Sequence, residues 1–260
     1  MKTKIINLIL ILLFVAGGTT DISAQIPKKV IEKYSTEIGV TPISKKYQEL
    51  GGESGILGKP ITEEKYCSDK ITKFRRYEQG AIYFHPDYTP IEIHGDIYNK
   101  WAKLGYEKSV VGLPTMDENA TPDKKGRYSS FEKGVIIWHP DLGAFEMHGE
   151  IVKKWIRIKD NLKVLGYPKT DEMITPDKVG RYNHFQYGSI YWSPNTGAHE
   201  VHGEILKKWA ELGYEKSYLG YPVSDEMVTP DKTGRYNRFE RGTIYWTPSK
   251  GAYVELKGKQ

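Results

Sequence analysis

The chain of 260 residues contains a single cysteine, Cys67, so no disulfide bond can form within it. It also lacks a strong charge bias, because the formal net charge is +5 and basic and acidic residues are interspersed. The apolar run at residues 5–16 is too short to span a bilayer comfortably, and no second apolar run of spanning length exists. These absences exclude stabilisation by internal disulfides and argue against nucleic acid as a partner. Cys67 is expected to be a small buried or loop residue, because no basic cluster surrounds it.

The N-terminus has the pattern of a secretory signal. Lys2 and Lys4 precede the apolar run 5–16, and small or polar residues follow up to Ala24. We expect cleavage after Ala24, which makes 1–24 a signal peptide and 25–43 a short lead-in segment. The mature protein is then secreted, extracellular or periplasmic, with envelope association as an option and no membrane span.

One phrase is repeated four times at a constant step of 54 residues. The marker glycines of the repeat are Gly58, Gly112, Gly166 and Gly220. An aromatic residue keeps the same step at Tyr47, Trp101, Trp155 and Trp209. The pattern predicts four units, at 44–97, 98–151, 152–205 and 206–260, with an atypical end to the last.

Each unit has the same predicted order of elements. A short helix such as "GEILKKWAELG" opens it, with Ile205, Leu206, Trp209 and Leu212 on one face and Gly213 as the C-terminal cap. "LGYP" follows as a turn, and "SDEMVTPDKTG" is predicted to be loop rather than strand. "GRYNRFE", "GTIYWTP" and "AYVEL" then predict a small antiparallel meander. The fold class is α+β in tandem units.

The aromatic residues of the strands alternate between two faces. Trp138, Trp192 and Trp246 share a face with apolar neighbours such as Ile244, which predicts a core position, as for Trp101, Trp155 and Trp209. A unit of one helix and a few strands cannot close a core alone. It is expected to bury its aromatic face against neighbouring units.

The period, the Leu-Gly-Tyr-Pro box, "KKWAELG" and the hairpin "RYNRFERGTIYWTP" together resemble the LGFP repeat family. The resemblance covers the chain beyond about residue 43. It implies a non-catalytic, cofactor-free module of secreted bacterial proteins that associates with the cell wall. It also implies units arranged like propeller blades, in a ring or an arc.

Two clusters invite a catalytic or metal-binding interpretation. His94, His148 and His202 could meet at a common axis to hold a metal. Each is better explained as a residue that finishes the last strand of its unit or helps to start the following helix. The acidic pairs are Glu63-Glu64, Asp117-Glu118, Asp171-Glu172 and Asp225-Glu226. Neighbouring carboxylates in a loop do not flank a sugar as glycosidase carboxylates do, so loop capping or pairing with Arg127, Arg181 and Arg235 is preferred. No catalytic residue and no metal ligand is assigned.

The candidate ligand-binding residues are aromatic and basic. Tyr83, Tyr191 and Tyr245 point away from the strand tryptophans, and aromatic rings beside polar donors are suited to sugars, although both sheet faces can also be covered. Arg127, Arg181 and Arg235 open the hairpins beside them. The predicted function is binding of an envelope glycan, such as peptidoglycan or a related wall polymer. The alternatives are a structural or protein-interaction scaffold that contacts envelope proteins and, less favoured, a glycan-active hydrolase.

Overall fold

The structure is a computed structural model that describes residues 40–158 and 160–258. The predicted signal peptide and nearly all of the lead-in segment 25–43 lie outside these residues. None of the described helices is long and apolar enough to cross a membrane.

Each of the four units consists of a helix followed by a four-stranded antiparallel sheet in sequence order. The first unit contains α3 (Pro42–Glu49), η2 (Gly52–Ser54), β1 (Lys65–Tyr66), β2 (Lys73–Arg76), β3 (Gly80–Phe84) and β4 (Ile91–His94). The second contains α4 (Gly95–Leu104), η3 (Tyr106–Lys108), β5 (Asn119–Ala120), β6 (Arg127–Ser130), β7 (Gly134–His139) and β8 (Gly143–His148). The third contains α5 (Gly149–Arg157), α6 (Asn161–Val164), β9 (Met173–Ile174), β10 (Arg181–His184), β11 (Gly188–Ser193) and β12 (Gly197–His202). The fourth contains α7 (Gly203–Leu212), η4 (Tyr214–Lys216), β13 (Met227–Val228), β14 (Arg235–Phe239), β15 (Gly242–Thr247) and β16 (Gly251–Leu256).

The predicted meander is present, with one additional strand in each unit. Met227 and Val228 lie in the segment expected to be loop, yet they pair with Tyr236 and Arg235 as the edge strand β13. A strand of two residues is too short to show an alternating pattern in the sequence. The following Thr-Pro-Asp segment is a turn, as expected.

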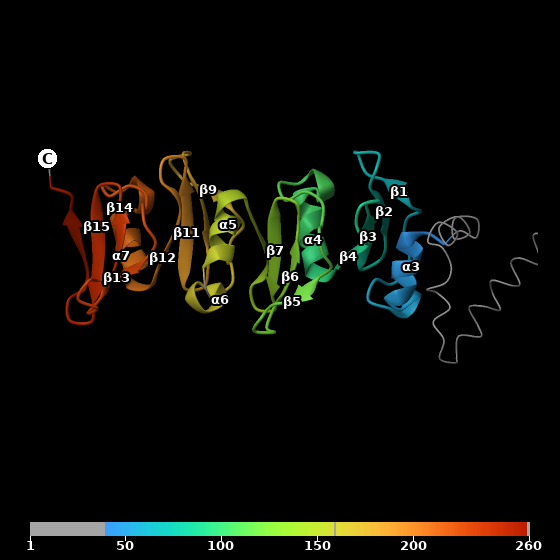
Figure 1. The fold of residues 1–260 in the computed structure, drawn as a ribbon, viewed down its shortest axis with the longest axis horizontal. Coiled ribbons are helices and arrows are strands. Elements are labelled where there is room, and N and C mark those ends of the chain that lie inside the picture. Colours follow the sequence, from blue (N-terminus) through green and yellow to red (C-terminus); the bar gives the residue numbers. More distant parts are fainter. Residues whose placement is uncertain (1–39, 159, 259–260) are drawn as a thin grey trace, which may run out of the picture.

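The four sheets form one open row, with a helix between each pair of successive sheets (Figure 1). α4 contacts strands of the first and second sheets, α5 those of the second and third, and α7 those of the third and fourth. Each of these helices and the two sheet faces beside it enclose one hydrophobic cluster. We call these the first, second and third junctions. A fourth cluster, which includes Ile43, Tyr47 and Tyr77, lies between α3 and the first sheet. Of the ring and the arc implied by the family resemblance, the closed ring is not formed: the four described units line up without closing.

The residues at the two ends of the row differ from those that form the junctions. On α4, Tyr98 and Tyr106 pack toward the first sheet, but Ser44 and Gly52 stand at the same positions beside α3. At the other end, Glu255 of β16 stands where the third sheet has the buried Val201. Contact between the two ends would bury the Glu255 carboxylate against a side of α3 that lacks these two tyrosines, and burial of an unpaired carboxylate is unfavourable.

The marker residues of the repeat have structural roles. Trp101 and Trp209 are fully buried, and Trp138, Trp155, Trp192 and Trp246 are partly buried beside the same clusters. The glycines Gly58, Gly112, Gly166 and Gly220 all have positive φ, between 70° and 78°. Side chains are strained in this region of backbone space, so the turn favours glycine.

Candidate functional site

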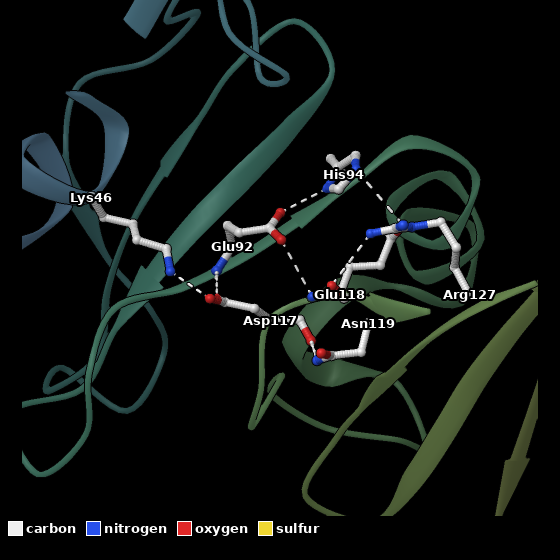
Figure 2. Close-up of polar contacts among 7 residues, drawn as sticks. All are labelled: Lys46, Glu92, His94, Asp117, Glu118, Asn119 and Arg127. Atoms are coloured by element: carbon white, nitrogen blue, oxygen red, sulfur yellow. Dashed lines mark hydrogen bonds and ion pairs between the residues drawn. The ribbon is translucent and has the colours of Figure 1, made fainter. Parts of the chain in front are cut away.

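The acidic pair of each later unit lies in a loop that reaches back to the preceding sheet. At the first junction, Asp117 accepts a hydrogen bond from the backbone N–H of Glu92 on β4 at 2.8 Å and forms an ion pair with Lys46 of α3. Lys46 and Asp117 are 71 residues apart, so this contact joins two units across the sheet between them (Figure 2).

The second acidic residue of the pair forms a buried chain of charges. His94, at the end of β4, lies 2.7 Å from Glu92 through Nδ1 and 3.7 Å from Glu118 through Nε2. Glu118 in turn pairs with Arg127 of β6 (Figure 2). The carboxylates of Glu92 and Glu118 are almost entirely buried, whereas the side chain of Arg127 is 42% exposed. The guanidinium is thus the solvent-facing end of the chain.

Burial and hydrogen bonding shift the pKa values of this network. The hydrogen bond from His94 to Glu92 raises the pKa of the imidazole, because it favours the charged ring. Burial raises the pKa of Glu118, and the neighbouring Arg127 and His94 limit the rise. The positive groups therefore offset only part of the cost of burying the Glu118 carboxylate.

The second junction repeats the arrangement. His148 contacts Glu146 at 2.8 Å and Glu172 at 3.2 Å, and Arg181 lies 3.6 Å from Glu172. Lys100 pairs with Asp171 as Lys46 does with Asp117.

The third junction departs from it. Glu200, which corresponds to Glu146, lies 2.7 Å from Lys154 and makes no hydrogen bond to His202 among the described residues. His202 is 3.4 Å from Glu226, and burial together with Arg235 lowers its pKa. Burial raises the pKa of Glu226 to about 7.

An open groove of about 310 Å³ lies beside the charge chain of the second junction. Its lining consists of His148, Gly149, Glu150 and Ile151 at the start of α5, with Glu172, Arg181 and Trp192. Arg181 and Trp192 are cross-strand partners, so their side chains share one face of the sheet. The same pairing joins Arg127 to Trp138 and Arg235 to Trp246, while the first unit has Lys73 opposite Phe84. The groove itself is found beside Arg181 and Trp192, and we use the name Arg–Trp grooves for this pair and the two equivalent pairs.

The structure separates the candidate tyrosines. Tyr83 and Tyr191 are 3% and 2% exposed, with their rings edge-on to Trp101 and Trp209 at 5.0 and 4.6 Å. Their expected role in gripping a ligand is replaced by a packing role, because the following helix covers that sheet face. Tyr245 stays partly exposed, since no described helix follows the fourth sheet.

The histidines and acidic pairs have the structural placement preferred from the sequence. His94, His148 and His202 each end a strand and directly precede a helix, one in each junction. Within residues 40–158 and 160–258, no group of three or more His, Cys, Asp or Glu side chains is arranged to hold a metal ion. Cys67 is buried, and burial raises the pKa of its thiol to about 12.

Sequence reasoning missed two kinds of junction residue. Lys46, Lys100 and Lys154 form the ion pairs that cross a sheet. Asn183 and Asn237 each donate side-chain hydrogen bonds to the backbone of the preceding sheet, at 3.1 and 2.9 Å. All keep the 54-residue step, which was the available signal.

These features define a tandem-repeat protein whose units are joined by polar chains and shared cores. The LGFP repeat model matches residues 57–109, 111–159, 165–217 and 219–259. The chain therefore belongs to the LGFP repeat family. A search of curated protein sequences finds no match.

Two solved structures show weak likeness to the chain. The extracellular domain of the one-component system BT4673 from B. thetaiotaomicron aligns with 78% of this chain at 10% identity and a TM-score of 0.18. The aligned part is 22% of that chain's length. Hsv2p from Kluyveromyces lactis aligns with 78% of this chain and 65% of its own at 7% identity and a TM-score of 0.15. TM-scores this low do not establish a common overall fold.

Proposed function

We propose that the protein is a secreted, non-catalytic repeat protein that binds a bacterial envelope glycan, such as peptidoglycan or a related wall polymer. The three Arg–Trp grooves are the observation that supports this function. They occur once in each of the last three units, at equivalent positions.

The chemistry of the groove suits a sugar. The partly buried Trp192 offers an apolar surface to the C–H face of a pyranose ring. Arg181 offers several N–H donors to hydroxyl or carboxylate groups, and its side chain is 42% exposed. A long polymer that occupies several weak grooves at once is held more strongly than a single sugar.

The test is co-sedimentation of the mature protein with purified, insoluble wall polysaccharide. The informative variant is Arg127→Lys/Arg181→Lys/Arg235→Lys, because Lys73 already occupies this position in the first unit. Lysine keeps the positive charge beside the buried glutamate but loses the planar fork of donors. We expect sedimentation of the wild type and at least about tenfold weaker binding of the variant.

The control is Arg157→Lys, a substitution at an exposed position of α5 outside the groove lining. It should sediment like the wild type. If the wild type stays in the supernatant, the glycan-binding proposal fails and the scaffold alternative gains support. If the triple variant binds as well as the wild type, the Arg–Trp grooves are not the binding sites.

A further inference from the structure

A second groove, of about 600 Å³, lies at the third junction between the hairpin of β10 and β11 and helix α7. This volume is within the range of small-molecule sites. It opens on the side of α7 that faces the third sheet, and its lining shares no residue with that of the groove beside Arg181 and Trp192. We call it the hairpin groove.

The first junction shows why the hairpin groove is open. There, the guanidinium of Arg76 lies 3.9 Å from the ring centre of Tyr106, and Tyr98 packs on the same ring at 5.9 Å. Two units later, His184 replaces Arg76 and Leu206 replaces Tyr98. The smaller side chains leave the space unfilled.

The charge of the hairpin groove also differs from its counterparts. The first, second and fourth units have Glu78, Glu132 and Glu240 at one lining position, and the third unit has Gln186. Gln186 keeps the local hydrogen bond, because its Oε1 accepts from the backbone N–H of Tyr167 at 2.9 Å as Glu240 does from Tyr221. The substitution thus removes a negative charge while retaining the turn, and adds amide donors.

Two lysines line the same groove, whose lining includes no Asp or Glu. Lys169 makes no ion pair among the described residues, while Lys207 contacts Glu204 at 2.6 Å outside the lining. The groove therefore favours an anionic group over a cationic one.

Aromatic rings complete the groove. Tyr187 is 60% exposed and stands where the other units have Gln79, Lys133 and Arg241. Tyr214 is held with a positive φ of 55°, and its ring packs edge-on against Trp209 at 5.5 Å. One wall is thus fixed, and the rim carries an aromatic residue that no other unit has.

We propose that the hairpin groove binds an acidic sugar, with the sugar ring beside Tyr187 and Tyr214 and its carboxylate near Lys169 and the Gln186 amide. The proposal rests on the proposed glycan-binding function for its ligand class. It places an acidic sugar in the hairpin groove rather than in the Arg–Trp grooves, and the residues that distinguish the hairpin groove occur in the third unit.

The test is isothermal titration of the full mature chain with N-acetylmuramic acid and with N-acetylglucosamine. The two sugars differ by the lactyl group that carries the carboxylate. We expect saturable binding of N-acetylmuramic acid and at least about fivefold weaker binding of N-acetylglucosamine. No saturable binding of N-acetylmuramic acid, or equal binding of the two sugars, would overturn the proposal.

Two variants use residues that the chain already accommodates elsewhere. Gln186→Glu restores the charge of the other units and should weaken binding of the acidic sugar by roughly fivefold. His184→Arg/Leu206→Tyr imports the residues that fill the first junction and should abolish binding. Both should melt within a few degrees of the wild type, and wild-type affinity in either one contradicts the proposal.

These outcomes are separate from those of the proposed function. Loss of sedimentation in the Arg-to-Lys triple variant concerns the Arg–Trp grooves, whereas the hairpin-groove variants retain all three arginines. An unchanged titration with a failed sedimentation test would leave the hairpin groove as a site for free acidic sugars.

Discussion

The phenol of Tyr167 in the third unit donates a hydrogen bond to the carboxylate of Asp123 in the second, at 2.6 Å. The same phenol lies 2.7 Å from Thr121 Oγ1. The tyrosine of the Leu-Gly-Tyr-Pro box therefore links its own unit to the turn of the preceding one. At the first junction, Leu113 and Cys67 occupy the positions of Tyr167 and Thr121, and both belong to the first hydrophobic cluster. The hydrogen-bonded contact of the second junction thus corresponds to an apolar contact at the first junction, where both contacting residues differ.

Removal of this hydroxyl should destabilise the array. Tyr167→Phe removes one hydrogen-bond partner from Asp123 and one from Thr121, which still bond to each other, and we expect the free energy of unfolding to fall by about 1–3 kcal/mol. Urea denaturation followed by tryptophan fluorescence measures the change. Tyr187→Phe is the matched control, because Tyr187 is 60% exposed. A loss of equal size in both variants would contradict a specific role for Tyr167.

Substitution of the marker glycine Gly166 should destabilise the protein for two separable reasons, backbone strain and a steric contact. Gly166 has a φ of +75°, and an added Cβ would lie 2.6 Å from Cβ of Gln186. Gly197 has a similar φ of +78° with nothing within 4 Å of an added Cβ. Gly197→Ala should therefore cost about 1 kcal/mol from backbone strain alone. Gly166→Ala should cost clearly more in the same denaturation measurement, and equal losses would show that the contact with Gln186 is unimportant.

Glu226 should make stability depend on pH. Burial raises its pKa in the folded protein to about 7 from the ordinary value of 4.5, so the folded state favours the protonated carboxyl. Its stabilising contribution is present below pH 4.5 and is lost as the pH rises through about 7. Glu226→Gln should therefore gain stability relative to the wild type between pH 4 and pH 8, by up to about 3 kcal/mol. A pH-independent difference would contradict this assignment.

The pKa values of His148 and His202 should be shifted in opposite directions from the ordinary value of 6.5. The hydrogen bond to Glu146 raises the pKa of His148, whereas burial and Arg235 lower that of His202. The stabilising contribution of His148 is present below pH 6.5 and lost as the pH rises through its folded pKa. That of His202 is present above pH 6.5 and lost as the pH falls through its folded pKa. NMR titration of the imidazole signals measures both, with Glu146→Gln expected to lower the pKa of His148.

The sequence predicted the elements of each unit well because those depend on local pattern. The alternation of Ile244, Tyr245 and Trp246 placed them on the correct faces, and Gly213 caps α7 with a φ of 102° as expected. The pairing of Glu118, Glu172 and Glu226 with arginines nine residues later is also confirmed.

Features that depend on how units meet could not be predicted in the same way. The contact of Lys46 with Asp117 spans more than one period, so no local pattern indicates it. Whether Tyr83 faces solvent or a helix depends on what lies beyond its sheet face, which the strand pattern does not specify. The absence of closure depends on how successive units are arranged in space, which the repeat pattern does not specify.

The central claim is that each unit depends on its neighbours for a complete core. In the second unit, α4 covers one face of the sheet, and α5 of the next unit covers the other face, where Ile137 and Met147 are 1% and 0% exposed. A single unit leaves this face in water, which a domain of this size cannot offset. The most direct measurement is thermal unfolding, by circular dichroism, of residues 95–148 expressed alone. We predict no cooperative transition for the single unit and a sharp one for residues 25–260; a sharp transition for the monomeric single unit would contradict the claim.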